Sequence, residues 1–71
     1  MTVWADEERP LTARHLEVVR LMAEGLTDRE IGVALGITVG TVKAHAQAIL
    51  RRTHAHTRTQ VVASCIRRGL I

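Results

Sequence analysis

The chain has 71 residues, enough for one domain with a small core, and its hydrophobic fraction of 46% excludes a wholly disordered chain. It has one Trp and neither Phe nor Tyr, so aliphatic residues must fill the core, which favours packed helices over a small β-barrel. Charge is divided along the chain. Residues 1–36 hold all seven acidic and four basic residues (net −3), and residues 37–71 hold six basic residues and no acid (net +6), which makes the second half a candidate phosphate-binding surface.

The first helix is predicted to begin after a short N-terminal segment. Residues 1–10 are expected to be a tail or the remnant of a linker, closed by Pro10, and residues 11–71 to form the domain. Thr12 is a good N-cap, and Gly25 lies where a left-handed residue would end the helix. Apolar residues recur at helical spacing between these two points: Leu16, Val19, Met22, Ala23 and Leu26.

The second helix has the clearest local start in the chain. Thr27 and Glu30 have the spacing of a capping box, in which each side chain accepts from the other residue's amide. Gly36 should end this helix after about two turns. Its expected buried stripe consists of Ile31, Ala34 and Leu35.

The third helix is predicted to run from Thr38 to about Thr53 with two contrasting faces. One face is apolar, with Val39, Val42, Ala46, Ile49, Leu50 and Thr53. The opposite face carries Gly40, Ala44, Gln47 and Arg51, with Lys43 beside it, and one flank carries Thr41, His45 and Arg52. A helix that is apolar on one side and small, amide and basic on the other is suited to contact a polar partner.

The fourth helix is predicted from about Thr59 to Arg68, after a connector over residues 54–58. Gly69 should stop it. Its inward residues are expected to be Val62, Cys65, Ile66 and Leu70.

The second and third helices have the spacing of a helix-turn-helix. This motif needs a small residue early in its first helix, a glycine to open the turn and an aliphatic residue six places later. Gly32, Gly36 and Val42 meet these needs, although Gly within a helix costs up to about 1 kcal/mol relative to Ala. The predicted fold class is all-α, with four helices and a helix-turn-helix.

The outward face of the third helix favours DNA as the partner. Gln47 can donate to adenine and Lys43 to guanine, and Ala44 is small enough to lie against a thymine methyl group. The alternative for Lys43 and Gln47 is an ordinary solvated helix surface. Four basic or imidazole side chains could hold phosphates: His45, Arg51, Arg52 and Arg58.

Short segments spread over residues 11–71 resemble one known family. They include Leu11-Thr12-x-Arg14, Glu17-Val18-Val19, Ala23-Glu24-Gly25-Leu26-Thr27, Glu30-Ile31, Leu35-Gly36-Ile37-Thr38, Thr41-Val42-Lys43-x-His45, Ile49-Leu50-Arg51-Arg52, Arg58-Thr59 and Gly69-Leu70-Ile71. Together they resemble the LuxR-type (GerE/NarL/FixJ-like) family, which includes the output domains of response regulators.

The resemblance implies a sequence-specific transcription regulator whose third helix enters the major groove, bound as a dimer on paired half-sites. It implies base contacts by Lys43, Ala44 and Gln47. It implies phosphate contacts by Thr27, Thr38, Thr41, His45, Arg51 and Arg58, to which the charge pattern adds Arg52. Family dimers use the fourth helix, which points here to Val61, Ser64, Cys65 and Arg68.

Several positions depart from the family pattern. His15 replaces an acid, which predicts the loss of the capping box at Thr12. Leu16 falls where a polar residue is common and should leave an exposed apolar spot. Ala46 stands where a larger residue is common, and Thr53-His54-Ala55 replaces a connector that usually reads Leu-Gly-Val.

An enzyme is not expected. Ser64 and Cys65 have no evident base partner, and so small a core leaves no room for a substrate pocket. No cofactor and no metal are expected, because Cys65 is the only cysteine and His54 and His56 lack a third ligand.

The expected partners are double-stranded DNA and a second copy bound through the fourth helix, and RNA polymerase is a further candidate. No apolar run approaches the roughly 18 residues of a membrane span, and the N-terminus lacks signal-peptide features, so we expect a cytoplasmic location with no membrane partner.

Two other interpretations stay open. Region 4 of a sigma factor shares the Gly-Ile-Thr-x-x-Thr-Val-Lys core, but the predicted fourth helix argues against it. A helix-turn-helix reused for protein interaction would expose an apolar or acidic face, which Lys43, Gln47 and Arg51 contradict. The chain is expected to be either a fragment of a longer regulator or a stand-alone regulator.

Overall fold

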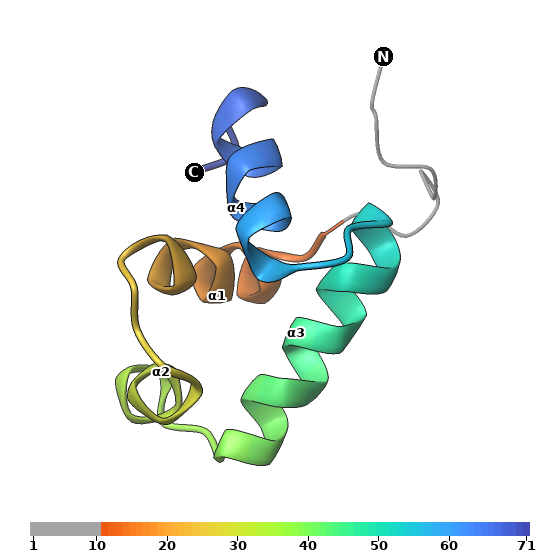
Figure 1. The fold of residues 1–71 in the computed structure, drawn as a ribbon. Helices are drawn as coiled ribbons and strands as arrows, with labels where there is room; N and C mark the ends of the chain where they lie inside the picture. Colours follow the sequence, from red (N-terminus) through yellow and green to blue (C-terminus); the bar gives the residue numbers. More distant parts are fainter. Residues whose placement is uncertain (1–10) are drawn as a thin grey trace.

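The computed structural model describes residues 11–71, and these form four α-helices with no strand. The helices are α1 (Ala13–Ala23), α2 (Asp28–Leu35), α3 (Val39–Thr53) and α4 (Arg58–Arg67). The predicted all-α, four-helix class is confirmed. In Figure 1, α3 runs along one side of the molecule. The helix α2 lies beside its N-terminal end, and α1 and α4 lie toward its C-terminal end. The predicted tail, residues 1–10, lies outside the described residues.

No single helix within residues 11–71 is long and apolar enough to cross a membrane, and only α2 and α3 taken together, bent by 106° at their junction, reach the required length.

A threonine begins each of the four helices. Thr12, Thr27, Thr38 and Thr57 all have extended backbone, and each hydroxyl oxygen accepts a hydrogen bond from the amide three residues later, at 3.1–3.2 Å. Such a cap typically contributes about 1 kcal/mol, because it satisfies an amide that the helix cannot. The fourth helix therefore begins at Arg58, just after Thr57 and one residue before the predicted start at about Thr59.

The start of α1 corrects the prediction made for His15. The amide of Thr12 donates to His15 Nδ1 at 3.2 Å, and the amide of His15 donates to Thr12 Oγ1 at 3.1 Å. The predicted loss of the capping box was wrong, because the unprotonated nitrogen of a neutral imidazole accepts as a carboxylate does.

The core takes side chains from all four helices. Its fully buried members are Val18, Val19, Ile31, Val42, Ile49, Val61 and Cys65. Leu16 is half-buried, whereas Ala23 and Ala34, which were expected inside, are exposed. Ile66 is 57% exposed, because the stripe of α4 that faces the core passes through Val61 and Cys65.

The turn between α2 and α3 has the geometry of a helix-turn-helix. Gly36 adopts a left-handed conformation (φ 70°, ψ 33°), and the amide of Ile37 donates a hydrogen bond to the carbonyl oxygen of Gly32 at 2.9 Å. This closes a Schellman-type turn, and the 106° bend lies within the range of the motif. A Cβ on Gly32 would lie 2.7 Å from the carbonyl oxygen of Ile37. Glycine is therefore the residue that the close turn requires at this position.

Candidate nucleic-acid interface

The outward face of α3 is the candidate interface. Lys43, Ala44, Gln47 and Arg51 are exposed, together with Gly40, while Val42, Ala46 and Ile49 on the other side are buried. The orientation of α3 that periodicity predicted is therefore confirmed, except that Val39, at the N-terminal end of the apolar face, is 37% exposed. Residues 37–71, which include α3, contain no acidic residue, so the side chains that α3 itself presents to an anion are positive or neutral.

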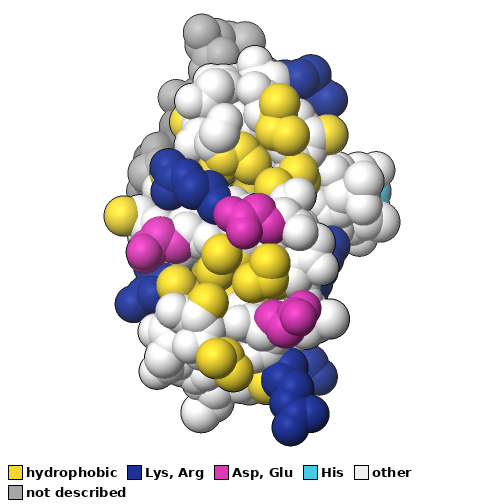
Figure 2. All heavy atoms as spheres, turned by 90° about the vertical axis from the view of Figure 1, so that its left-hand side faces the viewer, with side chains coloured by type: hydrophobic (Ala, Val, Ile, Leu, Met, Phe, Trp, Pro, Cys, Tyr) yellow, Lys and Arg dark blue, Asp and Glu magenta, His cyan; other side chains and the backbone are white. Residues whose placement is uncertain are grey.

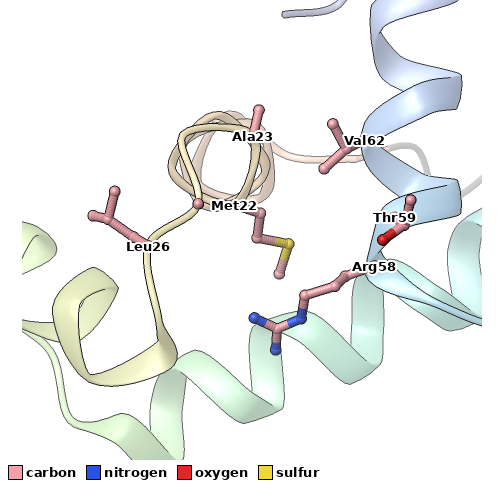
Figure 3. A pocket seen from close by; sticks show the side chains of 7 residues that line it. Met22, Ala23, Leu26, Arg58, Thr59 and Val62 are labelled. Carbon is pink, nitrogen blue, oxygen red and sulfur yellow. The ribbon is translucent and has the colours of Figure 1, made fainter.

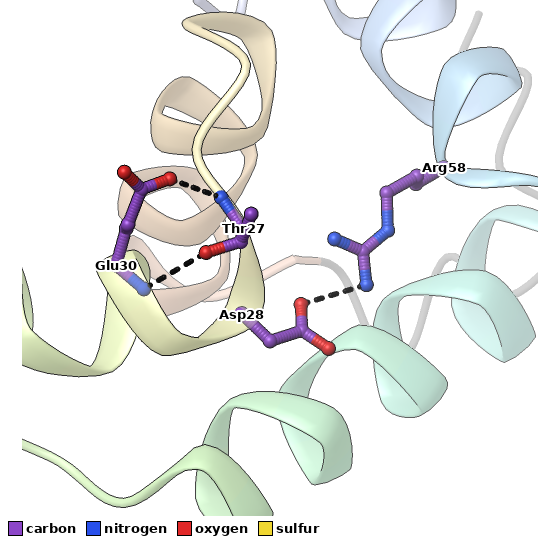
Figure 4. A network of polar contacts seen from close by, with 4 residues as sticks. All are labelled: Thr27, Asp28, Glu30 and Arg58. Atoms are coloured by element: carbon purple, nitrogen blue, oxygen red, sulfur yellow. Dashed lines mark hydrogen bonds and ion pairs between the residues drawn. The ribbon is translucent and has the colours of Figure 1, made fainter.

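The N-terminus of α3 is better suited to an anion than that of α2. Thr38 Oγ1 lies 2.9 Å from Thr41 Oγ1 and accepts from the Thr41 amide, and the first turn of α3 has no acid. The first turn of α2 contains Asp28 and Glu30, and Glu30 Oε1 accepts from the Thr27 amide at 2.8 Å (Figure 4). A phosphate at Thr27 would meet these carboxylates, whereas one at Thr38 would meet free amides and the positive end of the helix dipole.

One flank of α3 is tied to α1 through His15. The rings of His15 and His45 meet edge to face, with centroids 5.7 Å apart and planes at 73°. Arg52 Nη1 lies 3.3 Å from His15 Nδ1. His15 is only 6% exposed, and His45 and Arg52 are half-buried. Two of the candidate phosphate contacts are thus held against a buried side chain that the sequence analysis did not include in the site.

The protonation state of His15 follows from these contacts. Burial lowers the pKa of His15 below its usual value of 6.5, and the nearby positive charges of Arg52 and then His45 lower it further. Since an arginine can only donate, the His15 nitrogen that faces both Arg52 and the Thr12 amide must be the acceptor. The ring is therefore neutral, with its hydrogen on Nε2.

We expect this neutral ring to make the domain acid-sensitive. The pKa of His15 is lower in the folded than in the unfolded chain, so the stabilisation it confers is complete above about pH 6.5 and is lost as the pH falls through the folded-state pKa. The free energy of unfolding, measured by urea denaturation, should drop between pH 7 and pH 5. In His15→Gln, which keeps an acceptor for the cap, the drop in the free energy of unfolding should be smaller. If this free energy fell equally with pH in both proteins, His15 would not be the source of the acid sensitivity.

Arg58 is positioned by an ion pair with α2. Its Nη2 lies 2.8 Å from Asp28 Oδ1 (Figure 4), and the Asp28 side chain is only 20% exposed. The pair joins the first residue of α4 to the first residue of α2. The sequence analysis predicted Arg58 as a phosphate contact but missed Asp28, because nothing local relates two residues 30 positions apart.

A hollow of about 300 Å³ opens beside Arg58 (Figure 3). The Met22 side chain and the Arg58 guanidinium extend into it from α1 and α4. Arg58 is the only ionisable side chain among its lining residues, which are Met22, Ala23, Gly25, Leu26, Arg58, Thr59 and Val62. The hollow therefore has no acid–base pair that could take part in catalysis. Nor does any part of residues 11–71 gather three or more histidine, cysteine or acidic side chains that could hold a metal ion.

The residues predicted for a dimer interface on α4 do not share an exposed face. Val61 and Cys65 are 1% and 0% exposed, so their side chains fill the core and offer no surface to a second copy. Burial accordingly raises the pKa of the Cys65 thiol. Ser64 and Arg68 are half-buried, and Arg67 Nη2 donates to Ser64 Oγ at 3.2 Å.

The exposed apolar residue of α4 is Ile66, on a different side of the helix. It lines a shallow surface hollow together with Ile71 at the C-terminus and with Arg20, Ala23 and Glu24 at the end of α1. Figure 2 shows this face of α1, α2 and α4, where apolar patches alternate with acidic and basic side chains.

Comparison with known proteins gives a consistent match. The model of the family described as bacterial regulatory proteins, luxR family, matches residues 9–65, more than half of the chain. The transcriptional regulatory protein LiaR of Bacillus subtilis (strain 168) is 44% identical over 61 residues, covering 86% of this chain and 29% of its own length. The transcriptional regulatory protein DegU of Brevibacillus brevis is 43% identical over 61 residues, covering 86% of this chain and 26% of its own.

The fold is similar to that of a solved response regulator. ChrA, the response regulator of a heme-sensing two-component system, aligns with a TM-score of 0.83 and 28% identity, over 89% of this chain and 31% of ChrA. The chain spans less than a third of the length of all three of these proteins.

Proposed function

The chain belongs to the luxR family of bacterial regulatory proteins, and we propose that it is the DNA-binding module of a transcription regulator, in which α3 reads the major groove. The main support is α3 itself, which sets exposed Lys43, Ala44 and Gln47 on one face of a helix-turn-helix. LiaR and DegU, to which the chain is similar, are both named transcriptional regulatory proteins. The family is one of regulatory proteins, so the chain is a regulatory module and not an enzyme.

We propose that Lys43, Ala44 and Gln47 contact base edges, since amide and ammonium donors suit purine acceptors and a methyl group suits thymine. Phosphates would be held around them by Thr38, Thr41, His45, Arg51 and Arg52. Thr27 and Arg58 are the weaker candidates, because the carboxylates of Glu30 and Asp28 already occupy the Thr27 amide and the Arg58 guanidinium.

We further propose that the module binds paired half-sites as a homodimer, inside the cytoplasm, and that RNA polymerase is a further partner. Since Val61 and Cys65 lie in the core, a dimer formed through α4 would use its exposed side, which includes Ile66. The chain corresponds to less than a third of the length of LiaR and DegU, so the proposal concerns the DNA-binding module alone.

Selection from a random pool of DNA duplexes tests the proposal. The 71-residue chain should enrich a short motif at low and moderate salt, with affinity that falls steeply as salt rises. Two copies of the motif at a fixed spacing of about one helical turn would support the dimer. A single motif would limit the proposal to a monomer, and no enrichment at either salt concentration would favour a protein-interaction module instead.

Arg51→Ala should weaken binding to every duplex by a similar factor. Arg51 is exposed in the last turn of α3, where a guanidinium reaches a phosphate and not a base edge. The slope of log K against log salt should fall by about one, measured by fluorescence anisotropy between low and moderate salt. An unchanged slope would place Arg51 off the DNA, and a loss confined to one motif would make it a base contact.

A further inference from the structure

His15 is the only polar side chain among the buried residues of the described chain, and it connects three separate groups. Its Nδ1 accepts from the Thr12 amide at 3.2 Å and faces Arg52 Nη1 at 3.3 Å, and its ring meets the edge of the His45 ring. A buried polar group is expensive unless its hydrogen bonds are made, so these contacts stabilise one ring orientation.

The two partners of His15 on α3 belong to the candidate interface. His45 and Arg52 are seven residues apart, which puts them on the same flank of α3, two turns from one another. Both side chains contact His15 of α1. His15 is the third residue of α1, and its ring is held there by the capping box with Thr12. One imidazole thus contacts two of the candidate phosphate contacts on this flank, His45 and Arg52.

The bond to Arg52 is separate from the capping box. An imidazole nitrogen has one lone pair, and here the two donors share it, which agrees with the two long distances of 3.2 and 3.3 Å. The capping box alone would be complete without the second donor. The groups whose charge reaches His15 in the described chain are Arg52 and His45, both from α3.

We infer that His15 is a positioning residue of the DNA-binding surface, which fixes the side chains of Arg52 and His45 on the flank of α3 that meets the phosphate backbone. The inference rests on the proposed function. A fixed guanidinium loses less conformational freedom when it meets a phosphate, so the effect of His15 on DNA affinity should be transmitted through Arg52.

A double-mutant cycle between His15 and Arg52 tests this, with the 71-residue chain and its selected duplex. His15→Leu keeps an apolar side chain in the buried site but removes the acceptor, and it should weaken binding by about two- to tenfold. Arg52→Ala should weaken binding at least as much. The double variant should bind only slightly more weakly than Arg52→Ala alone, because the part of the His15 contribution that acts through Arg52 has already been lost and only the part that acts through His45 remains.

Two matched variants separate positioning from helix capping. Thr12→Ala removes the hydroxyl of the cap but leaves His15 in place, and it should keep DNA affinity within about twofold at a temperature where the chain is folded. His15→Gln restores an acceptor and should recover most of the affinity that His15→Leu loses. Additive losses in the cycle, an equal loss in Thr12→Ala, or no recovery in His15→Gln would each overturn the inference.

A measurement on the free chain keeps the inference separate from the proposed function. The heteronuclear NOE of the Arg52 Nε–H group should be lower in His15→Leu than in the wild type and unchanged in Thr12→Ala, which reports the ordering of the guanidinium without DNA. Ordered Arg52 in a wild type that binds no duplex would overturn the proposed function and, with it, the role of His15 on DNA. An Arg52 NOE that does not respond to His15→Leu would overturn the positioning itself.

Discussion

Gly32→Ala should destabilise the domain, although alanine is the better helix former. The new Cβ would lie 2.7 Å from the carbonyl oxygen of Ile37, which belongs to the backbone of the turn and cannot rotate away. Overpacking of this kind typically costs about 1–3 kcal/mol, and the gain in helix propensity offsets at most about 1 kcal/mol of it. Urea denaturation should show a lower midpoint with an unchanged m-value.

Gly40 provides the matched control for this prediction. It lies in the first turn of α3, and a Cβ there would have no neighbour closer than Thr38 Oγ1 at 3.8 Å. Gly40→Ala should therefore stabilise the chain, by up to about 1 kcal/mol. The test is that the two substitutions change the free energy of unfolding in opposite directions. If both stabilised the chain, the close approach of α2 to the turn would not limit the residue at position 32.

Lys43→Ala should reduce affinity for the selected duplex by about 1–3 kcal/mol and relax the preference at one base pair. Lys43 is exposed on the outward face of α3, and its ammonium can donate to the guanine acceptors of the major groove. The measurement is the affinity for the selected duplex and for variants changed at each position in turn. At the base pair that Lys43 contacts, the wild type should bind the selected base pair more tightly than the other three, and Lys43→Ala should bind all four with similar affinity.

Arg67→Ala is the control for charge alone. Arg67 is an exposed cation in the last turn of α4, so the substitution removes the same charge from another helix. It should leave the base preference unchanged. If Lys43→Ala instead lowered the affinity for every duplex equally, Lys43 would be a phosphate contact and the base would be read by another residue.

Local patterns predicted most of the helix boundaries. Threonine caps and Gly36 act within a few residues of themselves, so Thr12, Thr27 and Thr38 marked the helix starts correctly. The start of α4, predicted at about Thr59, lies one residue earlier, at Arg58, where the cap at Thr57 sets it. The apolar spacing of α4 correctly predicted Cys65 as buried but wrongly turned Ile66 inward, and the interface that the family resemblance implied at Val61 and Cys65 conflicts with the burial of both side chains.

The candidate interface was predictable to the extent that it lies on one helix. The period of α3 is enough to bring Lys43, Ala44 and Gln47 to one face. The partners of Arg52 and Arg58 were not predictable, since His15 and Asp28 lie 37 and 30 residues away and meet them only in the folded chain. The role of His15 also depends on its tautomer, which follows from its neighbours and not from its position in the sequence.

The pairing of Arg58 with Asp28 changes what a duplex would meet. The formal charge of +6 in residues 37–71 includes Arg58, whose guanidinium already neutralises a resident carboxylate at 2.8 Å. Each protein cation that newly neutralises a phosphate releases about one condensed counter-ion from DNA, and this gain in ionic entropy is what salt suppresses. A cation that keeps its own carboxylate releases none. The module should therefore behave toward salt as a less highly charged protein than its sequence suggests, with more of its affinity left to contacts that depend on shape and base identity.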